Sequence, residues 1–222
     1  GSGKTTTLYA TVNEISTPDV NVITVEDPVE YQLDGIKQIQ VNAKIGLTFA
    51  AVLRSILRLD PDIILVGEIR DQETAETAAQ SALTGHLVFS TLHTNDTATA
   101  VTRLIDMGVD PYLVASTVIG VFAQRLVRRL CPDCRAQEGE GDNSWHAPGC
   151  RHCDYSGFRG RVGIYELLLV SDDTRKLIME GRSSAEIHQH ARDNGMTTIL
   201  EDGLIKVEQG LTTRDEVFRV GH

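Results

Sequence analysis

The chain has 222 residues, of which 41% are hydrophobic and 5% are aromatic, and its formal net charge is −10. This length and composition fit an aliphatic, helix-rich α/β core of one large or two smaller domains. Strong binding to a phosphate backbone needs clustered cations, so the acidic balance argues against nucleic acid as the main ligand. No apolar run approaches the roughly 20 residues that span a bilayer, and we expect a soluble, cytoplasmic protein.

The first residues match the second half of a phosphate-binding loop that opens a helix, Gly1-Ser2-Gly3-Lys4-Thr5-Thr6. In the complete Walker A pattern another glycine and a buried strand come first, so both are expected upstream of residue 1. The backbone N–H groups of such a loop surround nucleotide phosphates. Lys4 would contact the β- and γ-phosphates, and the hydroxyl of Thr5 would bind Mg²⁺. The alternative is a glycine-rich helix start without a ligand.

Strand and helix signals alternate after this loop. Apolar residues at helical spacing predict a helix from Thr5 to Ile15. Strands are predicted at Asn21–Glu26, at Gly35–Asn42 (as a strand or a hairpin), at Asp62–Glu68 and at Leu87–Leu92. Further helices are predicted to start at Thr48 and end at Leu59, to start at Asp71 and end before Gly85, and to start at Asn95 or Asp96 and end at Met107–Gly108. This alternation predicts an α/β fold with a parallel, doubly wound sheet.

The second half of the chain has a different pattern. A long helix is predicted from Pro111 to Leu130, with Arg125, Arg128 and Arg129 in its last turns, where cations suit the helix dipole. Arg135–Gly149 has no periodicity and predicts a loop, and Arg161–Val170 predicts a strand. Short helices are then expected to begin at Ser171, at Ser183 or Ser184, and at Thr197 or Thr198. We therefore predict three parts: a core over 1–130, a cysteine module over 131–160 and a mainly helical region over 161–222.

Polar side chains end three of the predicted strands. Glu26 and Asp27 follow the first, Glu68 follows the third and His93 follows the fourth. Ligands bind at this edge of open α/β sheets. Glu68 is placed as a Walker B carboxylate that polarises the attacking water, and either Glu26 or Asp27 could hold Mg²⁺. His93 is a candidate γ-phosphate sensor, with solvated or purely structural strand ends as the alternative for all four.

Arg54 and Arg58 share one face of a predicted helix. Guanidinium groups stabilise the negative charge that builds up in phosphoryl transfer, so the pair could serve a neighbouring subunit as arginine fingers. From the residues alone, surface salt bridges are the alternative.

The cysteines form two matched pairs, Cys131/Cys134 and Cys150/Cys153. Two CxxC pairs at this spacing favour a tetrahedral zinc site over disulfides. Four thiolates leave no open coordination position, so the zinc is expected to be structural. Four reduced structural cysteines or a redox pair are the alternatives.

Several long motifs occur in order: GSGKTTTLYA, ITVEDPVEY, LRLDPDIILVGEIRD, STLHTNDT, AQRLVRRLCPDC and GFRGRVGIYELL. With these motifs the chain resembles the C-terminal ATPase domain of the type II secretion and type IV pilus assembly ATPases, the GspE-type traffic ATPases. The resemblance covers nearly the whole chain.

The resemblance implies a RecA-like P-loop ATPase that binds ATP, Mg²⁺ and Zn²⁺ and works as a homo-hexamer. It implies Walker A roles for Lys4 and Thr5, an acidic-box role for Glu26, a catalytic role for Glu68 and a sensor role for His93. By the same resemblance Arg54 and Arg58 act between subunits, and Arg161 contacts the nucleotide region.

The same family works on the cytoplasmic face of the inner membrane, bound peripherally to membrane platform proteins. The tetracysteine module points to secretion and pilus-extension ATPases and away from retraction ATPases. Secretion is the leading expectation and pilus extension the alternative. We also expect the isolated chain, with half a Walker A loop, to bind and hydrolyse ATP poorly.

Two other classes compete with this interpretation. RecA-like cores also drive nucleic-acid motors, but the chain lacks an aromatic or basic strand-binding stretch. A zinc-dependent docking module without enzymatic activity is the remaining alternative.

Overall fold

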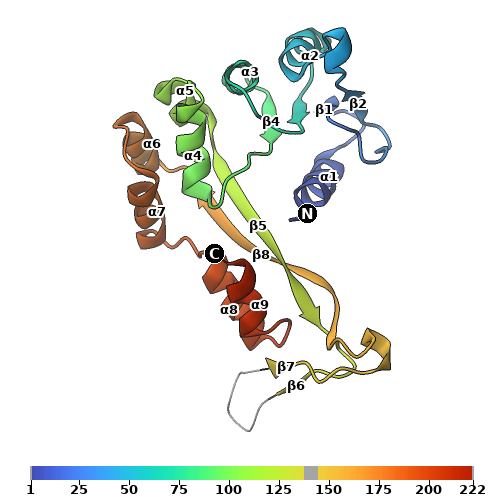
Figure 1. Ribbon diagram of the computed structural model, residues 1–222. Coiled ribbons are helices and arrows are strands. Elements are labelled where there is room, and N and C mark those ends of the chain that lie inside the picture. The colour runs from blue at the N-terminus through green and yellow to red at the C-terminus, as the bar shows by residue number, and fades with distance from the viewer. Residues whose placement is uncertain (1, 138–144, 222) are drawn as a thin grey trace. The chain divides into compact units, whose positions relative to one another are not determined.

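The computed structural model describes residues 2–137 and 145–221 (Figure 1). The chain divides into two compact units, which we call the larger and the smaller unit. The larger unit comprises Lys4–Val121 and Leu169–His190, and the smaller unit comprises Gly1–Gly3, Phe122–Leu168 and Ala191–His222. These limits differ from the borders expected at residues 130 and 160, and the three-part division stays a prediction.

The larger unit holds a four-stranded sheet in the order β2-β1-β3-β4 (Figure 1). The strands are β1 (Val22–Glu26), β2 (Lys37–Gln40), β3 (Ile63–Val66) and β4 (Leu87–Ser90). All three pairings are parallel, which confirms the predicted parallel α/β fold and shows that β2 does not form a hairpin with β1. Every residue of the central strands β1 and β3 is buried, as expected of Val- and Ile-rich strands covered on both faces.

Helices connect and follow these strands. They are α1 (Lys4–Ile15), α2 (Phe49–Ile56), α3 (Gln72–Leu83), α4 (Thr97–Asp106), α5 (Pro111–Thr117), α6 (Asp172–Met179) and α7 (Ser184–Asp193), with short 3-10 turns at Ala43–Ile45 and Leu57–Leu59. The side chains of Thr48, Asp71 and Asp96 each accept a backbone N–H in the first turn of α2, α3 and α4. The predicted caps are thus confirmed, and Asp96 is the cap in place of Asn95.

Helix α1 packs on the sheet through its apolar stripe. Val12 is fully buried against Val22 of β1 and against Ile63 and Leu65 of β3, and Leu8 adds to the same cluster. Because α1 also begins at Lys4, this packing fixes the position of the Walker A lysine relative to the sheet.

The smaller unit is built on two long strands, β5 (Gly120–Leu130) and β8 (Phe158–Leu169), which pair with each other. Helices α8 (Ile199–Glu208) and α9 (Arg214–Val220) belong to the same unit. Its core joins Val127 and Ile164 from the two strands to Ile199 and Val220 from the two helices.

The predicted helix from Pro111 to Leu130 is wrong beyond Thr117. Helix α5 ends there, Val118 has extended backbone angles, and the rest forms β5. Val121 and Phe122 are of the β-branched and aromatic types that strands favour, and the backbone partners of β5 come from β8, far along the chain. Arg125, Arg128 and Arg129 therefore lie on a strand.

The segment predicted as a loop contains two short antiparallel strands, β6 (Ala136–Gln137) and β7 (Trp145–His146). Arg135 and residues 147–149 have no regular secondary structure, as predicted, and residues 138–144 lie outside the described residues. Arg135 anchors the hairpin by donating to the carbonyl of Gly210 at 2.7 Å, and its guanidinium lies over the ring of Trp145. A pair of strands thus replaces part of the expected loop.

Among the helices of the described residues, none is both long enough and apolar enough to cross a membrane.

Candidate nucleotide site and metal centre

The end of β1 and the segments that follow β3 and β4 are hydrogen-bonded in series at the carboxyl edge of the sheet. The N–H of Gly67 donates to the carbonyl of Val25 at 2.8 Å, and the Thr91 hydroxyl donates to the carbonyl of Gly67 at 2.7 Å. A Cβ on Gly67 would lie 3.2 Å from the Val25 carbonyl oxygen and 3.4 Å from the Cα of Glu26. A glycine at position 67 therefore lets the acidic box and the Walker B segment approach each other.

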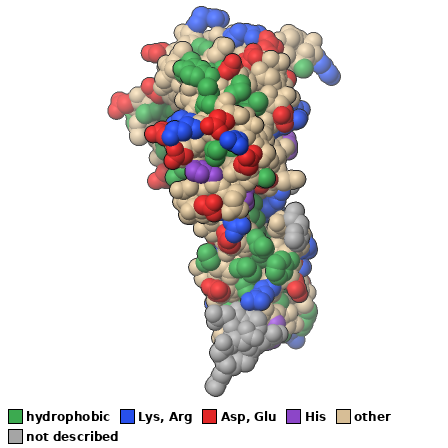
Figure 2. Space-filling model, turned by 90° about the vertical axis from the view of Figure 1, so that its left-hand side faces the viewer, with side chains coloured by type: hydrophobic (Ala, Val, Ile, Leu, Met, Phe, Trp, Pro, Cys, Tyr) green, Lys and Arg blue, Asp and Glu red, His purple; other side chains and the backbone are tan. Residues whose placement is uncertain are grey.

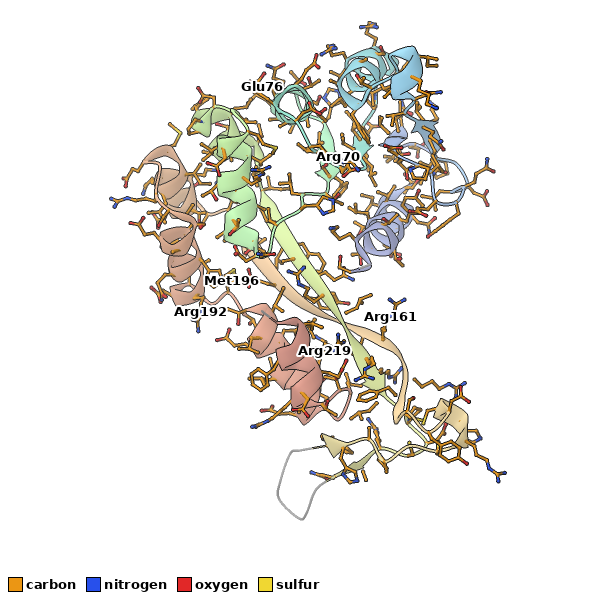
Figure 3. All side chains as sticks on the ribbon, viewed as in Figure 1. Arg70, Glu76, Arg161, Arg192, Met196 and Arg219 are labelled. Carbon is orange, nitrogen blue, oxygen red and sulfur yellow. The ribbon has the colours of Figure 1, made fainter. Side chains whose placement is uncertain are left out.

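Glu68 lies in this edge with an arginine and a histidine side chain beside it. One carboxylate oxygen pairs with Arg70, and the other lies 3.5 Å from Nε2 of His93. The Glu68 side chain is 13% exposed, whereas Arg70 and His93 are largely open to solvent. The structure thus brings Glu68 and His93 together, as their places at two strand ends suggested. It adds Arg70, labelled in Figure 3, which sequence reasoning missed.

Arg70 is influenced by two carboxylates. The hydrogen bond to Glu68, and then the charges of Glu68 and Asp27, raise the pKa of its guanidinium above the usual value. Asp27 is exposed and follows β1 directly. Arg70 therefore links the acidic box electrostatically to Glu68. Its place two residues after Glu68, in Gly-Glu-Ile-Arg-Asp, is the signal that could have found it.

Glu26 has a different environment from Asp27. It is 3% exposed, and its oxygens accept hydrogen bonds from Tyr9, from the hydroxyl of Thr24 at 2.5 Å and from Nε2 of Gln38 at 3.1 Å. Glu26 is thus held by three donors in the protein interior and does not face solvent. The catalytic role expected of Glu26 stays a prediction.

The Walker A residues open helix α1. Lys4 is its first residue and is half-buried, Thr5 and Thr6 are exposed, and Gly3 has a left-handed φ of +82° that favours glycine. Gly1 lies outside the described residues, and Ser2 precedes the helix. The free N–H groups of a helix start suit phosphate, and an ammonium with a neighbouring hydroxyl suits a magnesium nucleotide.

The candidate intersubunit arginines lie on the surface of the larger unit. Arg54 pairs with Glu73 at 2.6 Å, and both side chains are more than half exposed. Arg58 donates to the backbone carbonyl of Arg54 at 3.1 Å. Arg161 is exposed on β8 in the smaller unit (Figure 3). The salt bridge that was the alternative for Arg54 is therefore present, and the intersubunit and nucleotide roles stay predictions.

The four cysteines converge in the smaller unit. Cys131, Cys134, Cys150 and Cys153 are unbridged, and their sulfur atoms all lie within 4.8 Å of one another. Burial raises the pKa of Cys131, and it raises that of Cys134 to about 12. Burial also opposes ionisation of Cys153, but N–H donors from Cys150 and Gly157 lower its pKa to about 6. Four converging thiols in two CxxC knuckles are compatible with tetrahedral zinc.

A parallel sheet with Glu68, His93 and a Walker A helix start defines the RecA-like class of nucleotide-binding ATPase folds. The family model described as "Type II/IV secretion system protein" matches residues 1–219, and the chain belongs to this family.

Relatives and solved structures agree with this family. The type II secretion system protein HxcR of Pseudomonas aeruginosa is 56% identical over 99% of this chain and 46% of its own length. The type IV pilus assembly ATPase PilB of Thermus thermophilus is 50% identical over 98% of this chain and 26% of its own length. A crystal structure of the pilus retraction motor PilT with bound ADP has a TM-score of 0.77 at 31% identity, covering 99% of this chain and 58% of that one. The chain thus spans half or less of the length of these curated relatives.

Proposed function

We propose that this chain forms the catalytic part of an ATPase that powers protein secretion by a type II secretion system. The observation that carries the proposal is the meeting of Glu68, Arg70 and His93 at the strand edge of a fold whose relatives include named ATPases. Helix α1, which Lys4 and Thr5 open, packs on the same sheet.

The proposed roles follow from position and charge. Lys4 binds the β- and γ-phosphates, and Ser2, Gly3, Thr6 and the N–H groups of α1 support them, with Gly1 completing the loop. Glu68 accepts a proton from the attacking water or orients it, and His93 senses the γ-phosphate. Bound Mg²⁺ would neutralise phosphate charge, with Thr5 and an acidic-box carboxylate as its protein ligands.

Zinc has a structural role in this proposal. The four cysteines would supply all four tetrahedral positions with thiolates and so leave none for substrate. The metal would take the place of an apolar core between the two knuckles.

Assembly and location follow from the family. The whole protein is proposed to form a homo-hexamer, in which Arg54, Arg58 and Arg161 approach nucleotide, and to bind inner-membrane platform proteins from the cytoplasm. Pilus extension is the second candidate, favoured by the match to PilB. The alternative of a nucleic-acid motor lacks a continuous basic surface on the face shown in Figure 2, where acidic and basic side chains are interspersed over the larger unit.

Nucleotide binding by the whole protein tests the proposal. Lys4→Ala should abolish ATP binding and hydrolysis, because the phosphates lose their main cation. Lys44→Ala removes an exposed lysine from a 3-10 turn and is the matched control. Equal ATPase activity in wild type and Lys4→Ala would refute the proposed site, and strong stimulation by single-stranded DNA would favour the nucleic-acid motor.

The physiological process needs a separate test. In the source organism, Lys4→Ala should stop protein secretion and leave surface pili unchanged. Loss of pili with normal secretion would support the pilus-extension candidate.

A further inference from the structure

Both neighbours of Glu68 in the chain are hydrogen-bonded to a single residue, Thr91. The Thr91 hydroxyl donates to the carbonyl oxygen of Gly67 at 2.7 Å, and the Thr91 carbonyl accepts the backbone N–H of Ile69 at 3.0 Å. Gly67 precedes Glu68 and Ile69 follows it. Thr91 thus holds the chain on both sides of Glu68, once through its side chain and once through its backbone.

Only the bond to Gly67 depends on the kind of residue at position 91. Both bonds of Thr91 lie just beyond the paired part of β3 and β4, whose last partners are Val66 and Ser90. Any residue at position 91 has a carbonyl for Ile69, whereas the bond to Gly67 needs a side-chain donor. The half-buried Thr91 supplies this donor as a hydroxyl.

Gly67 is restrained from the opposite side as well. Its N–H donates to the carbonyl of Val25 at the end of β1, at 2.8 Å, so both of its backbone polar groups are bonded. The Gly67 carbonyl belongs to the peptide group that joins Gly67 to Glu68, and this group is planar. The Thr91 hydroxyl therefore restrains the orientation of this peptide group, and with it the direction in which the Glu68 side chain leaves the backbone.

The segment after β4 also reaches the side chain of Glu68. His93 follows Thr91 by two residues, and its Nε2 lies 3.5 Å from a carboxylate oxygen of Glu68. Arg70 pairs with the other carboxylate oxygen. His93 and Arg70 thus contact the carboxylate, whereas Thr91 holds the backbone from which the side chain starts.

We infer that Thr91 is a positioning residue for ATP hydrolysis: its hydroxyl fixes the peptide group before Glu68, and so the place from which the carboxylate acts on the attacking water. A general base must lie within hydrogen-bond reach of the proton that it takes, and a misplacement of about 1 Å can cost about 100-fold in rate. The inference rests on the proposed ATPase function and deepens it, because it names a residue that acts through the proposed base.

Steady-state ATPase kinetics of the whole protein test the inference. Thr91→Val keeps the shape of the side chain and removes the donor, so it should lower kcat about tenfold with little change in KM. Thr91→Ser keeps the hydroxyl and should restore most of kcat. Thr117→Val is the matched control, because the Thr117 hydroxyl also donates to a backbone carbonyl at 2.7 Å, that of Leu113 within α5. It should lose as much thermal stability as Thr91→Val and keep the wild-type kcat.

A double variant separates positioning from a general structural role. Because Thr91 acts through Glu68, Thr91→Val/Glu68→Gln should be no slower than Glu68→Gln alone when single turnovers are measured. If Thr91→Val does not fold, the comparison of Thr91→Ala with Thr91→Ser decides, since these two side chains differ only in the hydroxyl.

Three results would overturn the inference: a wild-type kcat in Thr91→Val, an equal fall of kcat in Thr117→Val, or losses that multiply in the double variant. Where Thr91→Ala and Thr91→Ser decide, equal rates would do the same. Failure of the proposed function looks different, because wild type would then neither bind nor hydrolyse ATP, or Glu68→Gln would hydrolyse it at the wild-type rate.

Discussion

Nε2 of His93 lies 3.5 Å from a carboxylate oxygen of Glu68, so side chains that follow two different strands meet at one edge of the sheet. The other oxygen of Glu68 pairs with Arg70. A carboxylate between an imidazole and a guanidinium is held in place on both sides, and 13% of its side chain stays open to solvent.

Arg70→Met tests whether this restraint helps catalysis. Without the guanidinium, Glu68 loses one of its two partners and rotates more freely, so we expect kcat of the whole protein to fall about tenfold with little change in KM. Steady-state ATPase kinetics measure this, and Arg103→Met on the exposed side of α4 is the control. A rise in kcat would instead identify Arg70 as an inhibitory clamp on Glu68.

Zinc should be bound at one ion per chain. Elemental analysis of the purified protein is expected to show it, and Cys134→Ser should lose it together with several degrees of thermal stability, because the knuckles have little apolar core. Asp154→Asn, which lies next to Cys153 and outside the four thiols, should keep the metal. A full complement of zinc in Cys134→Ser would exclude the tetracysteine site.

Gly210→Ala tests the docking of the β6–β7 hairpin on the turn after α8. Gly210 has a φ of +65°, and a Cβ there would lie 2.6 Å from the ring of Trp145. Gly181 has a φ of +67° with open space around it, so Gly181→Ala carries the backbone cost alone, about 1 kcal/mol. We expect Gly210→Ala to cost at least about 2 kcal/mol in urea unfolding, because the steric clash adds to the backbone term. Equal costs for the two variants would show that the Trp145 contact is not formed.

Glu216 links α9 to β5 and should make the free energy of unfolding depend on pH. Burial opposes its ionisation, but hydrogen bonds from Arg219 and Arg128 lower its pKa from 4.5 to about 2. A carboxyl with a lowered pKa in the folded state adds stability above about pH 5, and this stability is lost as the pH falls toward 2. Both arginines are about half exposed, so Glu216→Ala should cost only about 2 kcal/mol at pH 7.

Urea unfolding of the chain at several pH values, followed by Trp145 fluorescence, measures this effect. The cost of Glu216→Ala should shrink between pH 5 and pH 2, where the wild type loses the same contribution. Asp215→Asn, an exposed neighbour on α9, should show little change. If the stability cost of Glu216→Ala did not vary with pH, Glu216 would not be held ionised by Arg128 and Arg219.

The fold of the larger unit could be predicted because its signals are local. The helix caps Thr48, Asp71 and Asp96 sit in front of periodic segments, and β1 and β3 are short apolar runs. Strand β5 could not be predicted, because the sequence of Gly120–Leu130 also fits a helix. Its partner strand β8 lies beyond the cysteine segment in the chain. Distant backbone pairing overrides local propensity, and one sequence does not reveal it.

The candidate site could be predicted to a similar extent. Strand ends placed Glu68 and His93 at one edge, and the two CxxC pairs placed four thiols together. Arg70 and Tyr9 were missed, because an exposed arginine and a helical tyrosine carry no signal until their partners are known. The sequence also did not show that Glu26 is buried and Asp27 exposed. Which of two neighbouring residues at a strand end faces the interior depends on the packing of the folded protein.

The central claim is that Glu68 is the catalytic carboxylate of an ATPase. Its most direct test is the hydrolysis rate of the whole protein carrying Glu68→Gln, measured alongside ATP binding and with Glu14→Gln, on the exposed face of α1, as the control. We expect ATP binding to be retained and kcat to fall at least about 100-fold, as for the loss of a general base. A wild-type rate in Glu68→Gln would contradict the claim.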